Sequence, residues 1–116
     1  MVFFLALSSD VKAQMGLTVI NETRCELLVT FIDGRTNCVP CPPSAQHFLA
    51  PGQGIDVAPQ CGGNWIAVSY VVNGGSSFGI AFNPALNCGN DVNGVCTGPI
   101  DHNWFTNAGN YELLLQ

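Results

Sequence analysis

The fold is decided by residues 65–82, which read WIAVSYVVNGGSSFGIAF. Residues 65–72 contain no Gly, Pro or charged residue and are dominated by the β-branched and aromatic side chains that favour strands. Phe78, Ile80 and Phe82 alternate with small residues, which is the two-residue period of a strand. Asn73-Gly74-Gly75 between the two segments is typical of a hairpin turn. We therefore predict an antiparallel hairpin of Trp65–Val72 and Phe78–Phe82.

Other short apolar segments lie between turn residues along the rest of the chain. They predict strands at Leu17–Ile20, Leu27–Ile32, His47–Leu49, Ile55–Ala58 and Tyr111–Leu115. Asn83 to Asn103 is a long polar connection. No stretch of the chain longer than a few residues has helical periodicity. The pattern predicts an all-β fold, a small antiparallel β-sandwich of six to eight strands.

The segment Trp65–Val72 is apolar on both of its faces. A strand that is buried on one side only should alternate more clearly between apolar and polar residues. We expect this strand to be central, with its second face covered by the long loops. The alternative is that the second face binds a partner or another copy of the chain.

The composition bounds the function. Of 116 residues, 47% are hydrophobic and 9% are charged, whereas ordinary domains have about 25% charged residues. The length suits one domain with one core, and the composition is the opposite of a disordered chain. Three basic and eight acidic residues give a net charge of −5, without a cluster of Lys or Arg. Nucleic acid and anionic membranes are therefore poor partners, and no apolar run approaches the roughly 18 residues of a membrane span.

The N-terminal residues are similar to the end of a secretory signal. An apolar run at residues 2–7 precedes a short polar stretch, with Val11 and Ala13 at the third and first positions before a cleavage site. The run is short and no basic segment precedes it, so we interpret residues 1–13 as the remnant of a signal that begins upstream. Cleavage would leave residues 14–116 as a single domain. The alternative is an apolar N-terminal strand of the mature fold.

Six cysteines in so short a chain, after an export-like start, are typical of a disulfide framework in a secreted or periplasmic protein. They are Cys25, Cys38, Cys41, Cys61, Cys88 and Cys96. The sequence does not choose among the pairings. Proximity favours Cys88–Cys96, and Cys25–Cys61 with Cys38–Cys41 is one arrangement of the others.

Cys38-Val39-Pro40-Cys41 is the one motif that could carry cysteine chemistry. It resembles the redox motif of thioredoxin-like oxidoreductases, in which a helix N-terminus makes the first thiol reactive. Here two prolines follow Cys41 and no amphipathic helix follows them, so we favour a structural disulfide loop. No second closely spaced cysteine pair supports a zinc site. We predict no metal and no cofactor.

The remaining polar motifs do not predict an enzyme. His47 and His102 are the only histidines, and no G-x-S-x-G motif accompanies them. Residues 90–94, NDVNG, contain the oxygen ligands and glycine of a fragment of a calcium loop, but Asp91 is their only acidic residue. Polar turn chemistry explains them better.

Aromatic residues next to loops suggest a surface for ligand binding. Trp65, Tyr70 and Trp104, with the amide of Asn103, could stack on and hydrogen-bond to a sugar ring. The alternative is that both Trp side chains fill the core, as is common in small sandwiches.

Two segments resemble small secreted β-sandwich proteins. The first is TVINETRC at residues 18–25, and the second is LAPGQ at residues 49–53. The first is also similar to the start of thaumatin-like proteins, although these are longer and have more cysteines. The resemblance implies architecture only.

We therefore expect an exported, non-enzymatic binding or adhesion module for a glycan or a protein. A structural subunit that assembles through pairing of its terminal strands is the alternative, since self-association of this kind would use the chain ends. A thiol–disulfide redox protein that uses Cys38 and Cys41 is a minor one.

Overall fold

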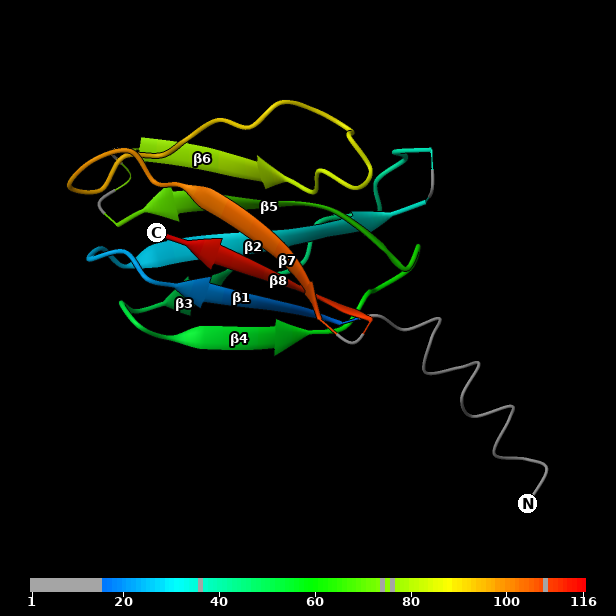
Figure 1. Cartoon of the computed structure of the whole chain (residues 1–116), viewed down its shortest axis with the longest axis horizontal. Coiled ribbons are helices and arrows are strands. Elements are labelled where there is room, and N and C mark those ends of the chain that lie inside the picture. The colour runs from blue at the N-terminus through cyan, green and yellow to red at the C-terminus, as the bar shows by residue number, and fades with distance from the viewer. Residues whose placement is uncertain (1–15, 36, 74, 76, 108) are drawn as a thin grey trace, which may run out of the picture.

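The structure is a computed structural model that describes residues 16–35, 37–73, 75, 77–107 and 109–116. Eight strands form two four-stranded sheets that face each other (Figure 1). Their bounds are β1 Leu17–Asn21, β2 Leu27–Gly34, β3 His47–Leu49, β4 Gly54–Val57, β5 Asn64–Val72, β6 Ser77–Phe82, β7 His102–Asn107 and β8 Asn110–Leu115. The predicted signal remnant lies outside the described residues. Among those residues, no helix is long and apolar enough to cross a membrane.

The predicted hairpin is confirmed. Strands β5 and β6 are antiparallel, with Val72 opposite Ser77 and Ala67 opposite Phe82. On its other side β5 pairs with β2, and β2 pairs with β3, so the sheet order is β3-β2-β5-β6. Strand β5 is therefore central, as its apolar sequence predicts.

The second sheet contains both chain-terminal strands. Its order is β4-β1-β8-β7. Strands β1 and β8 run parallel, with Val19 opposite Leu113, and all other strand pairs among the described residues are antiparallel. The inward side chains of the two sheets form one core, and Val19, Val29, Val68 and Leu113 have no exposed surface. This arrangement is the predicted disulfide-stabilised β-sandwich.

Strand β7 is the element that the sequence did not predict. Only two of its residues are apolar, Trp104 and Phe105, and they are adjacent, so the segment lacks the alternation of a half-buried strand. It forms because β8 offers a free edge, and it pairs with β8 from His102 to Asn107. The polar connection between β6 and β7 is therefore shorter than predicted.

The three disulfides have a different pairing from the one that proximity favours. The bonds are Cys25–Cys96, Cys38–Cys88 and Cys41–Cys61. All join residues far apart in sequence, and Cys25–Cys96 spans 71 residues. The suggested Cys88–Cys96, Cys25–Cys61 and Cys38–Cys41 pairs are wrong, because the fold brings the ends of different strands together. Three intramolecular disulfides indicate an oxidising compartment.

The outer face of the β3-β2-β5-β6 sheet has an apolar row across its four strands. Cross-strand pairing aligns Phe48, Leu28, Val71 and Phe78. Phe48 and Phe78 are exposed, and the other two are half-buried. The loops therefore do not cover this part of the second face of β5, contrary to expectation.

Candidate functional site

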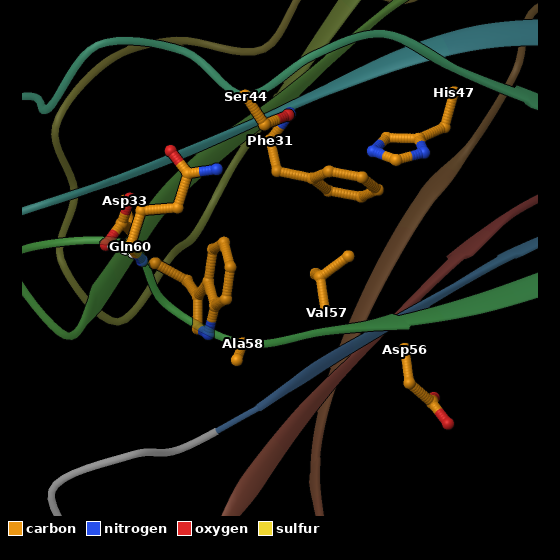
Figure 2. Close-up of a pocket in the computed structure, with 9 residues that line it drawn as sticks. Phe31, Asp33, Ser44, His47, Asp56, Val57, Ala58 and Gln60 are labelled. Carbon is orange, nitrogen blue, oxygen red and sulfur yellow. Dashed lines mark hydrogen bonds between the residues drawn. The ribbon is translucent and has the colours of Figure 1, made fainter.

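A cavity of about 280 Å³ opens between the two sheets on the side of β3 and β4. Its apolar wall consists of Phe31 and Trp65 from the inner face of one sheet, with Val57 and Ala58 at the end of β4. The polar lining is Asp33, Ser44, His47, Asp56 and Gln60. Figure 2 shows Phe31, His47 and Val57 directed toward the same space from different elements.

Asp33 is the most deeply buried polar group of this cavity. It lies near the end of β2, next to a register shift after Ile32, and is 2% exposed. Its Oδ2 accepts hydrogen bonds from the backbone N–H groups of Gln60, Cys61 and Gly62, at 2.8, 2.9 and 3.2 Å. Three such bonds fix the carboxylate and tie the chain after β4 to β2.

The Cys41–Cys61 disulfide adjoins this carboxylate. The two sulfurs and a carboxylate oxygen of Asp33 lie within 4.8 Å of one another. This is the spacing of a metal centre, but both sulfurs form the disulfide and so do not offer thiolates. Cys38 is bonded to Cys88, so the two cysteines of the CVPC motif do not form a redox pair with each other. The minor redox prediction therefore lacks its dithiol.

The other polar side chains of the cavity differ in whether they already form hydrogen bonds within the protein. The Ser44 hydroxyl accepts from the Phe31 N–H and donates to the Ala45 carbonyl, both at 2.9 Å. Asp56 accepts from the Thr18 hydroxyl at 2.5 Å, and its side chain points away from the cavity in Figure 2. The His47 ring lies 5.5 Å from that of Phe31, centroid to centroid. Among the described residues, no hydrogen bond occupies the side chain of the half-buried His47 or of the exposed Gln60.

The four residues predicted to form a stacking surface do not lie together. Trp65 and Tyr70 are 2% and 1% exposed, because both face inward from the central strand β5. Trp65 contributes to the wall of the cavity, whereas Asn103 donates to Gln116 Oε1 on the outside of β7. The prediction of one exposed platform is wrong because the aromatic residues of a central strand are needed in the core.

Trp104 lines a second hollow, on the opposite edge of the sandwich. This space of about 280 Å³ is also lined by Asn83, Asn87, Asp91 and His102. The Trp104 ring packs against the core and edge-on against Tyr111, with 6.4 Å between centroids. Its Nε1–H is buried and has no acceptor among the described residues. The hollow is more open than the first cavity, and its two ionisable side chains, Asp91 and His102, are hydrogen-bonded to each other.

Tyr70, His102 and Asp91 form a hydrogen-bonded chain that runs from the core to the surface, where Asp91 is exposed. The Tyr70 hydroxyl lies 2.7 Å from His102 Nε2, and His102 Nδ1 lies 2.9 Å from Asp91 Oδ2. The hydroxyl also accepts from the Gly94 N–H at 2.9 Å. A Cβ atom at Gly79 or Gly94 would collide with the Tyr70 ring. The chain resembles a catalytic arrangement in composition, but the hydroxyl is enclosed and fully engaged, so its role is to join the two sheets.

Burial raises the pKa of Tyr70 above its ordinary value of 10.0, and the negative charge of Asp91 raises it further, while the bond from Gly94 opposes both. The neutral phenol is therefore favoured in the folded state. Its contribution to stability is fully present below the unfolded pKa of about 10 and is lost as pH rises through the folded pKa. We expect the free energy of unfolding to fall above about pH 10, and Tyr70→Phe to flatten that fall. Denaturant unfolding across alkaline pH, beside the tyrosinate absorbance, measures both effects, and an unchanged slope in the variant would exclude Tyr70 as the cause.

Neither the protein-family models nor the curated proteins contain a match to this chain. The candidate site therefore stands on its geometry alone.

Proposed function

We propose that this chain is an exported, non-enzymatic binding module that holds a small ligand, or one residue of a larger glycan or protein, in the cavity between its sheets. The observation that carries the proposal is the composition of that cavity, where two aromatic walls meet a buried carboxylate. Small-ligand sites typically combine an apolar lining with a few placed polar groups. Export is supported by the three disulfides, which persist in oxidising compartments.

A non-enzymatic role is supported by how the groups in the cavity are engaged. Ser44, His47 and Asp33 are the residue types of a hydrolase triad and line one cavity. In a triad the hydroxyl bonds to the imidazole and the imidazole to the carboxylate. Here Ser44 bonds to backbone atoms, and the hydrogen bonds to Oδ2 of Asp33 come from backbone N–H groups. Among the described residues, no hydrogen bond joins His47 to either of them.

The alternative of a subunit that assembles through its terminal strands has less support. Strands β1 and β8 are the two inner strands of their sheet and pair with each other. Assembly through them would require both to leave the sheet, together with the buried side chains of Leu17, Val19, Leu113 and Leu115.

A thermal-shift screen tests the binding proposal. The panel would contain monosaccharides, aromatic alcohols and organic ammonium compounds, each at millimolar concentration. A ligand at a hundred times its Kd stabilises the folded state by about 2.7 kcal/mol, which for a domain of this size raises Tm by on the order of 10 °C. We expect at least one compound to produce a shift of this kind.

The control is a matched pair of variants. Gln60 lines the cavity and is exposed, while Gln46 is also exposed but lies outside the lining. Gln60→Trp should abolish the shift by filling the mouth of the cavity, and Gln46→Trp should retain it. If no compound stabilises the wild type, or if both variants keep the shift, the cavity is not the binding site.

A further inference from the structure

The charge state of the cavity indicates which class of ligand it would accept. Asp33 is 2% exposed, and a carboxylate removed from water is normally paired with a cation. The one ion pair found among the described residues joins His102 to Asp91, so none of these residues supplies a cation to Asp33. The backbone hydrogen bonds described above all reach Oδ2. Its Oδ1 accepts no hydrogen bond from the described residues.

Two aromatic rings lie beside this carboxylate. Asp33 on β2 is directly opposite Trp65 on β5, and the Cβ atoms of such a pair are about 5 Å apart. Phe31 lies on the same inner face of β2 and lines the same cavity. Aromatic faces attract cations, and the attraction is stronger where water is excluded. Carboxylate and rings are thus complementary to one positively charged group.

The remaining lining disfavours other ligand classes. No Lys or Arg contributes to it, and the two acidic side chains of the lining, Asp33 and Asp56, would repel a carboxylate or phosphate. A neutral sugar needs several free donors and acceptors that converge on its hydroxyl groups. The Ser44 hydroxyl is occupied by its two backbone partners, and Asp56 points away (Figure 2). Within the described part of the chain, the polar groups that remain free in the lining are His47, Gln60 and Oδ1 of Asp33, which are few for a ring with several hydroxyl groups. The cavity also lies just below the usual range for drug-sized ligands, which begins at about 300 Å³.

We infer that the inter-sheet cavity binds an organic ammonium group, such as a quaternary amine on a short apolar or hydroxylated chain. This inference rests on the proposed function, because it names the ligand class of the same site. The ammonium would lie between the two aromatic rings, with Oδ1 of Asp33 as its counter-ion.

A comparison of two probes of the same shape tests this inference on the unaltered protein. Choline carries a quaternary ammonium, and 3,3-dimethyl-1-butanol has the same shape with a neutral carbon in place of nitrogen. Titration of ¹⁵N-labelled protein with each probe gives two dissociation constants. We expect choline to bind at least about tenfold more tightly. The amide signals of Gln60, Cys61 and Gly62 should move with it, because these groups bond to Asp33.

A charge variant tests the role of Asp33 separately. Asp33→Asn retains the shape of the side chain and should remove the preference for choline. Asp101→Asn removes an exposed charge outside the cavity and should keep that preference. If Asp33→Asn does not fold, the comparison of the two probes on the unaltered protein still tests whether the cavity prefers an ammonium group.

The outcomes separate this inference from the proposed function. Equal affinity for the two probes, with shifts at the cavity, would overturn the ammonium assignment and leave the cavity as a binding site. Absence of choline binding, while another panel compound stabilises the protein through the cavity, would do the same. If no compound of the panel binds, both proposals fail.

Discussion

Replacing Cys25 and Cys96 with alanine is expected to lower the free energy of unfolding by about 4 kcal/mol. This disulfide closes the longest loop of the three, with a sequence separation of 71 between its cysteines. In the chain-entropy account, a cross-link stabilises by restricting the unfolded chain, and the effect grows slowly with loop length. Both cysteines also pack against the core. Equilibrium unfolding in guanidinium chloride measures the loss, which is a large fraction of the stability of such a small domain.

The Cys41–Cys61 bond provides the matched control, since it spans 20 residues. Its double alanine variant should lose about 3 kcal/mol on the same argument. A larger loss from this pair than from Cys25–Cys96 would contradict the loop-length account. It would show instead that the contact between this disulfide and Asp33 dominates.

Asn21→Ala is expected to lower the free energy of unfolding by about 3 kcal/mol or more, because it leaves several buried groups without partners. Asn21 has no exposed surface. Its Nδ2 donates to the carbonyls of Cys25 and Leu49, at 2.8 and 2.9 Å. Its Oδ1 accepts from the backbone N–H and the hydroxyl of Thr23, at 2.9 and 2.6 Å. This one side chain closes the turn between β1 and β2 and ties it to β3.

Two further variants sharpen the Asn21 experiment. Asn21→Asp has nearly the same shape but replaces two donors with a charge that faces carbonyl oxygens, so we expect a larger loss than for alanine. Asn90→Ala, at an exposed position of the loop after β6, should change stability by less than about 0.5 kcal/mol. A loss below about 1 kcal/mol for Asn21→Ala would mean that water replaces the missing bonds.

The buried hydrogen bonds of Asn21 also explain a short motif that, in the sequence alone, matches a glycosylation site. Asn21-Glu22-Thr23 matches the glycosylation sequon. The Asn21 amide is buried and both of its bonds are internal, so it is inaccessible in the folded chain. The Asn and Thr are present here because they form a buried turn.

Most strands were predictable because the pattern of apolar residues in the sequence matches the side chains that face the core. Strands β2 and β6 face the core with alternate side chains, and β5 is apolar on both faces, as suits its central position. Strand β7 was not predictable, since its pairing with β8 rather than its own sequence makes it a strand. The disulfide pairing was also beyond reach, because it depends on which strand ends meet in space.

The candidate site was only partly predictable. The importance of Trp65 could be read from its place beside a glycine pair, but its inward direction follows from the central position of β5. Asp33 could be read only as part of a turn signal, Asp33-Gly34. Its role depends on backbone N–H groups of residues 60–62, about thirty positions away. Sites built from contacts between distant segments leave little local trace in a sequence.

The most direct test of the proposed function is to map where a ligand binds. We would titrate ¹⁵N-labelled protein with the panel compound that raises Tm most and record which amide signals move first. The account predicts Phe31, His47 and the segment at residues 60–62, all at the cavity between the sheets. Shifts confined to the outer row of Phe48 and Phe78, or to the hollow beside Trp104, would contradict it and move the binding site to that surface.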